Sequence, residues 1–202
     1  MKLFYAPGAC SLSPHIVAIE AGLPIEFEKV DLGKHKTESG KDFMTINPKG
    51  YVPSLQLDDG TVLTEGPAIV QYLADQKPSS GLAPANGTVE RYKLQEWLNF
   101  IGTELHKNFG PLFNPATPDA VKEMSKANIT KRLTYLNEQL ANKQYLMGNN
   151  FTVADAYAFT IVNWTNFVKM DLKPYPNVVA YMQRVGSRPK VQETLKSEGL
   201  MK

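Results

Sequence analysis

Cysteine is nearly absent from this chain of 202 residues, which contains a single one, Cys10. One cysteine cannot close an intrachain disulfide and cannot supply a thiolate zinc site, so disulfide scaffolds and cysteine-based zinc modules are excluded. We expect no metal cofactor. A chain without disulfides fits a reducing compartment, and we therefore expect a cytoplasmic protein.

The sequence also lacks a long apolar run and an excess of charge of one sign. Charged or amide residues interrupt every apolar segment before the roughly 18 residues that a membrane span needs. Pro7 and Gly8 end the apolar amino terminus well before it reaches the length of a signal-peptide core. With 22 basic and 20 acidic residues the net charge is +2, too small for the positive field that binds nucleic acid. We expect neither a membrane nor a nucleic acid as partner.

The first half alternates strand and helix signals in an ordinary globular composition, 43% hydrophobic and 21% charged. Residues 2–6 and 25–30 each predict a strand. Between them, Ser13 and Pro14 open a helix that Gly22 ends. A right-handed crossover through this helix makes the two strands parallel neighbours.

A polar stretch over residues 32–49 follows, and we expect a mobile surface loop there. Residues 52–57 and 61–63 predict a hairpin, with Asp59 and Gly60 supplying the positive φ angles of a tight turn. Pro53 must lie at a strand start, an edge or a bulge, because proline donates no ladder hydrogen bond. Pro67 then opens a further helix. The order strand-helix-strand, strand-strand-helix predicts a thioredoxin-like α/β domain over residues 1–80.

Residues 81–87 are rich in proline, glycine and polar residues and predict a linker. Beyond them strand signals end and apolar residues recur three or four apart, so we predict an all-helical domain over residues 88–202. Thr152 and Asp155 predict a capping box worth about 0.5–2 kcal/mol. Other predicted helix starts are Pro118, Pro176 and Pro189.

Four motifs are similar, in order and spacing, to the bacterial beta class of cytosolic glutathione transferases. They cover residues 5–11 (YAPGACS), 47–53 (NPKGYVP), 63–69 (LTEGPAI) and 96–107, where EWLNF is followed by TELHK. The resemblance runs over essentially the whole chain. It implies a homodimer that binds glutathione and transfers it to hydrophobic electrophiles, or exchanges it with disulfide substrates.

Cys10 stands at a turn into a helix, where unpaired amides and the positive dipole end favour an anion. Such a position can lower a cysteine pKa from about 8.5 to between roughly 3.5 and 7.5, which makes a thiolate nucleophile at neutral pH. A lone cysteine can equally be a small buried hydrophobe. The resemblance favours the nucleophile and implies a mixed disulfide between Cys10 and glutathione.

Three further positions are implied to bind the glutathione peptide. The amides of Glu65 and Gly66 precede a helix, so they would face a carboxylate while Glu65 pairs with an ammonium, and the γ-glutamyl end of glutathione carries both. An ordinary strand-to-helix turn is the alternative. The resemblance also implies a cis peptide bond between Val52 and Pro53, which leaves the Val52 backbone to pair with the peptide of the ligand.

His35 departs from the beta-class pattern, in which a lysine meets the glycyl carboxylate of glutathione. A neutral histidine donates a hydrogen bond but loses its charge near pH 7. We therefore expect weaker glutathione binding above pH 7 than below it, unless Lys34 or Lys36 compensates.

One helix carries the remaining candidates. Asn99, Thr103 and His106 fall near one face at intervals of four and three, a spacing that a solvated polar face also shows. The resemblance implies that Glu104 and Lys107 reach glutathione across the dimer interface and that His106 lies near its sulfur, with a catalytic role beside Cys10. It implies Leu105 as a further glutathione contact. For the electrophile we expect an apolar pocket lined by Phe109, Phe113 and Trp164.

Two other functions compete with transfer of glutathione. The first is a glutaredoxin-like disulfide reductase that uses Cys10 as its attacking thiol. The second is a non-catalytic binder of hydrophobic ligands built on a transferase scaffold. Replacement of Cys10 by alanine separates transfer from reduction, and retention on glutathione-agarose tests the binder.

Overall fold

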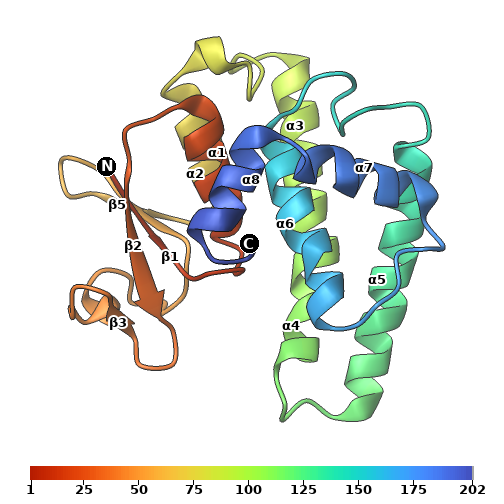
Figure 1. Cartoon of the computed structure of the whole chain (residues 1–202), viewed down its shortest axis with the longest axis horizontal. Coiled ribbons are helices and arrows are strands. Elements are labelled where there is room, and N and C mark those ends of the chain that lie inside the picture. Colours follow the sequence, from red (N-terminus) through yellow and green to blue (C-terminus); the bar gives the residue numbers. More distant parts are fainter. Residues whose placement is uncertain (202) are drawn as a thin grey trace. The chain divides into compact units, whose positions relative to one another are not determined.

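The computed structural model describes residues 1–201, and its contacts divide them into two compact units. The first holds residues 1–83 together with the segment from Ser187 onward, and the second holds residues 84–186. Figure 1 shows the sheet in the first unit and helices alone in the second.

The first unit is built on a mixed sheet of five strands. Its elements are β1 (Lys2–Tyr5), α1 (Leu12–Ala21), β2 (Glu26–Asp31), β3 (Lys36–Thr37), β4 (Ser54–Gln56), β5 (Val62–Thr64), α2 (Gly66–Asp75), a 3₁₀ turn η2 (Pro78–Ser80) and α8 (Pro189–Ser197). The strand order is β3-β2-β1-β4-β5, with β1 parallel to β2 and antiparallel to β4. The predicted thioredoxin-like order is therefore confirmed.

Local turn signals account for most of these boundaries. Gly22 ends α1 in the left-handed conformation with a φ of 64°, and Pro53 stands directly before β4, both as predicted. The hairpin turn differs from the prediction. Only Gly60 has a positive φ, 87°, and its amide donates to the Leu57 carbonyl while the Leu57 amide donates to the Thr61 carbonyl. The loop thus has three residues with glycine last, instead of a two-residue turn.

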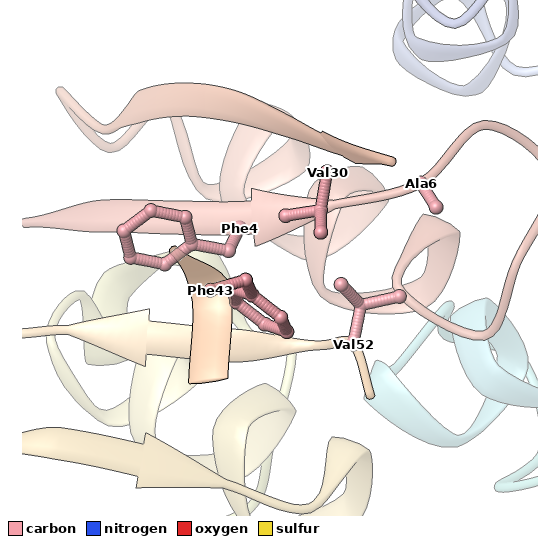
Figure 2. Packing of buried hydrophobic residues seen from close by; sticks show 5 residues of the cluster. All are labelled: Phe4, Ala6, Val30, Phe43 and Val52. Carbon is pink, nitrogen blue, oxygen red and sulfur yellow. The ribbon is translucent and has the colours of Figure 1, made fainter. Parts of the chain in front are cut away.

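The polar stretch of residues 32–49 contains more structure than its composition suggests. It forms β3 and a 3₁₀ turn η1 (Phe43–Thr45), and Phe43 is fully buried. Figure 2 shows Phe43 packed with Phe4, Ala6, Val30 and Val52, and the two phenyl rings lie 5.8 Å apart. The expectation of a purely surface segment is therefore wrong. Burial of the Phe43 side chain anchors the segment to the core and stabilises the fold by about 1.5–3 kcal/mol.

A buried carboxylate fastens β2 to this segment. Glu28 accepts hydrogen bonds from Ser39 at 2.5 Å and from the Lys2 ammonium at 2.9 Å. Burial raises the pKa of Glu28, but hydrogen bonds from Ser39, Thr37 and Lys2 outweigh it and hold the pKa at about 2.

The end of the chain packs on the first unit. Helix α8 contacts α1, and Arg188 makes a two-pronged ion pair with Glu20 at 2.6 and 2.9 Å. Lys190 donates to the Ile19 carbonyl at 3.0 Å. Contacts thus assign residues from 187 onward to the first unit, although the sequence places them in the helical half. The domain bounds 1–80 and 88–202 stay a prediction.

Every element of the second unit is helical, as predicted. The elements are α3 (Val89–Phe100), a π-helical segment η3 (Ile101–His106), α4 (Lys107–Phe113), α5 (Asp119–Gln139), α6 (Val153–Phe167) and α7 (Pro176–Gly186). Figure 1 shows α3 and α4 as one continuous run beside α5, and α4 packs against α5.

Helix α6 is the central element of this unit, since nearly all of its residues are buried. Its predicted capping box is present: the Asp155 carboxylate accepts from the Thr152 amide at 2.8 Å and from the Thr152 hydroxyl at 3.0 Å. The same carboxylate accepts from the Leu146 amide at 2.8 Å and from the Tyr181 hydroxyl at 3.1 Å. Asp155 therefore ties the start of α6 to the preceding loop and to α7.

Candidate active site

The loop between β1 and α1 carries Cys10 and is closed by the hydroxyl of Ser11. This hydroxyl accepts a hydrogen bond from the Ala6 amide at 3.0 Å and donates one to the Ala6 carbonyl at 3.2 Å. Gly8 has a φ of 73°, a conformation that glycine adopts without a side-chain clash. Cys10 consequently lies in a tightly closed loop directly before the first turn of α1.

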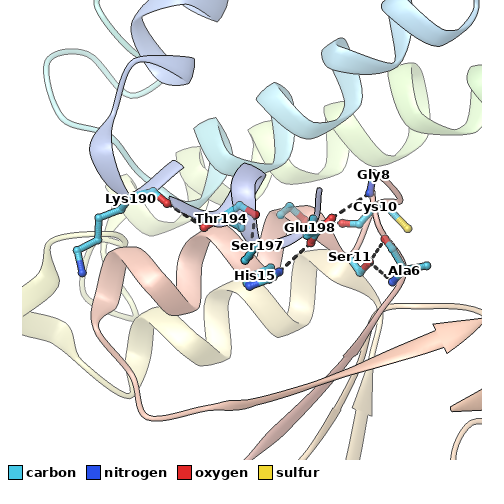
Figure 3. A network of polar contacts seen from close by, with 10 residues as sticks. Ala6, Gly8, Cys10, Ser11, His15, Lys190, Thr194, Ser197 and Glu198 are labelled. Atoms are coloured by element: carbon cyan, nitrogen blue, oxygen red, sulfur yellow. Dashed lines mark hydrogen bonds and ion pairs between the residues drawn. The ribbon is translucent and has the colours of Figure 1, made fainter. Parts of the chain in front are cut away.

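A carboxylate from the end of the chain holds the same loop (Figure 3). Glu198 accepts a hydrogen bond from the Gly8 amide at 2.9 Å, and its other oxygen lies 2.8 Å from Nδ1 of His15. The Glu198 side chain is fully buried, and His15 stacks on Phe27 at 4.1 Å between ring centroids. Because burial of a charged group requires partners, these contacts fix the loop. The sequence did not predict Glu198, which is 190 positions from Gly8.

The sulfur of Cys10 differs from its prediction. Its thiol donates a hydrogen bond to the Val52 carbonyl at 3.1 Å, and burial raises the pKa of the Cys10 thiol to about 11. The amides of Cys10 and Ser11 lower this pKa, as expected at a helix start, but burial outweighs them. The expected lowering of the Cys10 pKa is therefore not found in the unliganded protein, where the thiol donates to the Val52 carbonyl.

The peptide bond between Val52 and Pro53 is cis, as predicted. The loop before it is braced by Asn47, whose amide group donates to the Tyr51 carbonyl at 2.7 Å. Val52 itself is buried in the cluster of Figure 2. The structure thus brings the Val52 backbone and the Cys10 sulfur together, and the carbonyl predicted to pair with a ligand is occupied by the Cys10 thiol.

Glu65 lies between β5 and α2 with a φ of 68°, which residues other than glycine rarely adopt. Its carboxylate accepts from the Lys49 ammonium at 2.6 Å and from the Tyr51 hydroxyl at 2.7 Å. Gly66 is the first residue of α2, so its amide belongs to the turn in which a helix offers donors to other partners. The carboxylate expected to bind an ammonium therefore already binds one. Neither Lys49 nor Tyr51 was predicted, although both stand in the motif of residues 47–53.

His35 is exposed between β2 and β3, and its φ is 51°. Its ring lies against Gly50, where an added Cβ would be 3.2 Å from Cε1 of His35. The imidazole is thus next to the loop that carries Lys49. Lys34, the expected substitute, lies 3.7 Å from the Asp31 carboxylate.

The second unit arranges the other predicted residues along one helical run, from α3 through η3 to α4. The Thr103 hydroxyl donates to the Asn99 carbonyl at 2.9 Å, and Glu104 forms an ion pair with Arg132 of α5 at 2.5 Å. Leu105 is fully buried, so its side chain belongs to the core of the unit. Of the predicted residues on this run, Asn99, Thr103 and Lys107 are exposed.

His106, the last residue of η3, stands in an aromatic cluster. Its Nδ1 lies 2.6 Å from the Tyr157 hydroxyl oxygen, and its ring meets Trp164 edge to face at 4.9 Å. Trp164 also contacts Phe109 at 5.7 Å and Phe113 at 5.3 Å. The three residues expected to line an apolar pocket therefore pack together beside His106, and Tyr157 is the partner that sequence reasoning missed.

Two negative observations concern residues 1–201. No group of three or more histidine, cysteine, aspartate or glutamate side chains there is arranged to hold a metal ion. No helix in that range is long and apolar enough to cross a bilayer.

Comparison with known proteins agrees with this architecture. The chain matches the model of the glutathione S-transferase N-terminal domain over residues 8–76 and that of the C-terminal domain over residues 100–189. It is 50% identical to glutathione S-transferase GstA of Escherichia coli O157:H7, over 99% of this chain and 100% of the relative.

Two solved structures are similar over nearly the whole chain. A sphingomonad glutathione S-transferase complexed with glutathione is 49% identical, with a TM-score of 0.96 over 99% of this chain and 100% of that one. The beta-class glutathione S-transferase of Sphingomonas chungbukensis is 48% identical, with a TM-score of 0.96 over 100% of both.

A thioredoxin-like unit joined to an all-helical one, with a cysteine after the first strand, defines the class as that of the glutathione transferases. The chain belongs to the glutathione S-transferase family. The prediction of a transferase of the bacterial beta type is confirmed by these relatives.

Proposed function

We propose that this transferase binds reduced glutathione on its first unit and directs the ligand's sulfur at hydrophobic electrophiles. The observation that carries the proposal is the hydrogen bond from Cys10 to the Val52 carbonyl. A thiol next to this backbone supports the proposal, because the cysteinyl residue of glutathione would pair with the same strip. The sphingomonad relative that holds glutathione supports the choice of ligand.

Each end of the tripeptide has a proposed partner. Glu65 and Gly66, at the start of α2, bind the γ-glutamyl group, its ammonium on the carboxylate and its carboxylate on the helix amides. Val52 pairs with the cysteinyl peptide, and His35 meets the glycyl carboxylate. The run from α3 through η3 into α4 adds Asn99, Thr103, Glu104, Leu105, His106 and Lys107.

Conjugation needs glutathione's own thiol, not that of the protein. With chlorodinitrobenzene as test substrate, the thiol loses its proton, its sulfur bonds to the ring carbon, and chloride leaves. Oriented hydrogen-bond donors stabilise the sulfur anion, and we assign His106 to this role. The aromatic residues around Trp164 supply the apolar surface for the electrophile.

Disulfide exchange is the second proposed activity, and it depends on Cys10. The Cys10 thiolate attacks the glutathionyl sulfur of a mixed disulfide, forms a protein–glutathione disulfide and releases the other thiolate. A second glutathione then reduces this bond, which regenerates Cys10 and yields glutathione disulfide. Because burial raises the pKa of Cys10 to about 11, the thiolate is a minor species at pH 7. We therefore expect exchange to be the slower activity, which argues against a dedicated reductase.

The variant Cys10→Ala tests this division of labour. We expect conjugation of chlorodinitrobenzene to persist at near the wild-type rate, whereas reduction of a glutathione mixed disulfide should disappear. Loss of both activities in a folded variant contradicts the division, and retention of disulfide reduction contradicts the role of Cys10. If the wild-type protein binds hydrophobic ligands but has neither activity, the result supports the alternative function, a non-catalytic binder of hydrophobic ligands.

We also propose a homodimer in a reducing compartment. The exposed apolar residues Val89 and Tyr92 on α3, 69% and 61% exposed, support a partner surface on that helix. The proposed reach of Glu104 across the interface requires it to leave, or share, its ion pair with Arg132. Light scattering should give twice the chain mass of 22.5 kDa, and a mass of one chain contradicts the dimer.

A further inference from the structure

The hydroxyl of Tyr157 contacts the ring of His106. Its oxygen lies 2.6 Å from Nδ1, a short distance for a neutral hydrogen bond. Tyr157 is 2% exposed, so water cannot readily replace this contact. A buried phenol that binds one imidazole nitrogen restricts both the rotation of the ring and the site of its proton.

A second aromatic side chain from the same helix limits the ring further. Trp164 lies seven residues after Tyr157 on α6, a spacing that puts both on one helix face. Its ring meets the imidazole at an interplanar angle of 73° and a centroid distance of 4.9 Å. Tyr157 therefore holds the imidazole through a nitrogen while Trp164 packs against the ring, and both contacts come from the most buried helix of the unit.

The helical run that carries His106 is adapted to this contact. Residues 101–106 form a π-helical segment, a conformation that occurs mostly as single-turn insertions in α-helices and frequently at functional sites. The Tyr157 hydroxyl lies over Gly102 of this segment, where an added Cβ would be 3.6 Å from the hydroxyl oxygen. The Tyr157 hydroxyl thus lies between the backbone of η3 at Gly102 and the imidazole ring of His106.

We propose that Tyr157 is a positioning residue: its hydroxyl donates to Nδ1 of His106, so the neutral imidazole carries its proton on Nε2. A phenol is a better donor than acceptor and a neutral imidazole nitrogen is a good acceptor, which fixes the direction of the bond. An Nε2–H group is the donor that a sulfur anion requires. The inference rests on the proposed function insofar as it places His106 near that sulfur.

Nitrogen NMR tests the tautomer without any substrate. The chain has only three histidines, so the imidazole signals can be assigned with single substitutions. In the wild type we expect His106 to show one tautomer, protonated at Nε2, at a pH where the ring is neutral. In Tyr157→Phe the signal should move to a mixture of tautomers. A wild-type ring protonated at Nδ1, or an unchanged tautomer in the variant, overturns the proposal.

Kinetics test whether the contact serves the reaction. Tyr157→Phe should lower kcat for conjugation roughly tenfold, as expected for loss of one buried hydrogen bond at a reacting group, with the KM for glutathione unchanged. In a His106→Ala background the same change should have no further effect. Additive effects of the two substitutions, or a wild-type kcat in Tyr157→Phe, contradict the inference.

Tyr181→Phe is the matched control. Tyr181 is another fully buried tyrosine of the second unit, and its hydroxyl binds Asp155, not His106. We expect this variant to lose stability and keep both the His106 signal and kcat, which separates positioning from a general loss of packing. If the wild type fails to bind glutathione by calorimetry, the proposed function fails, whereas the NMR result still decides the Tyr157 contact.

Discussion

Replacement of Asp155 by asparagine should be among the most destabilising conservative changes in the second unit. Each carboxylate oxygen accepts two hydrogen bonds, one from the Leu146 amide and the Tyr181 hydroxyl, the other from the amide and hydroxyl of Thr152. An asparagine must turn its NH₂ group toward one of these pairs of donors. The buried amide left there costs about 1–3 kcal/mol, and loss of the capping box costs about 0.5–2 kcal/mol.

Together these losses predict a fall of about 2 to 5 kcal/mol in the free energy of unfolding, or roughly 5 to 15 °C in thermal midpoint for a chain of this size. Thermal and urea unfolding measure both. Asp119→Asn is the matched control, because Asp119 also stands in the first turn of a helix but its side chain is 99% exposed. It should change stability by less than about 0.5 kcal/mol. Equal effects of the two variants would contradict a stabilising role for the buried contacts of Asp155.

The same residue predicts a pH dependence. Burial raises the pKa of Asp155 from 3.8 to about 6, despite its four hydrogen-bond donors. The carboxyl of Asp155 therefore binds its proton more tightly in the folded state than in the unfolded state. The protonated carboxyl stabilises the fold fully below pH about 4, and this stabilisation is lost as the pH rises through about 6. A shift of about two units corresponds to about 3 kcal/mol. The stability gap between wild type and Asp155→Asn should narrow from pH 4 to pH 7, and a constant gap contradicts this assignment.

Three more predictions follow from the first unit. Glu28→Gln should lower the free energy of unfolding by about 2 to 3 kcal/mol at neutral pH, because the folded pKa of this carboxyl is about 2. Its ionised form stabilises the fold fully above pH about 4.5, and this stabilisation is lost as the pH falls through about 2. An equal loss of stability at pH 2 and pH 7 contradicts this prediction. Glu198→Ala removes the hydrogen bond from the Gly8 amide, which loosens the loop that carries Cys10. Modification of Cys10 by an aromatic disulfide should then become roughly five to ten times faster in the folded protein. An unchanged rate contradicts the role of Glu198 in holding this loop. His35→Lys should strengthen glutathione binding at pH 8 more than at pH 6, and a wild-type affinity that is flat between these pH values in calorimetry rejects the role of His35.

The features that the sequence predicted are those decided by near neighbours. Gly22 ends a helix because it alone accepts the left-handed conformation there without cost, and Thr152 and Asp155 cap α6 across three residues. Pro53 is confined to a strand start by its missing donor. In each of these cases the chemistry that decides the structure lies within a few positions of the residue itself.

The features that it missed depend on residues far apart in the chain. Tyr157 meets His106 across 51 positions, and Glu198 meets Gly8 across 190. The pKa of Cys10 was predicted with the wrong sign, because the helix start is a local signal whereas burial is a property of the folded unit. Burial also explains the missed core residue Phe43: the polar residues around it in the sequence predicted a surface segment, but the folded unit buries its side chain.

The most direct test of the glutathione site is a calorimetric titration of reduced glutathione into the purified protein and its Glu65→Gln variant. We expect saturable binding with one site per chain, and a clearly weaker affinity in the variant, because the carboxylate at the start of α2 is assigned to the ligand's ammonium. Absence of binding in the wild type, or equal affinity in the two proteins, contradicts the proposed glutathione site.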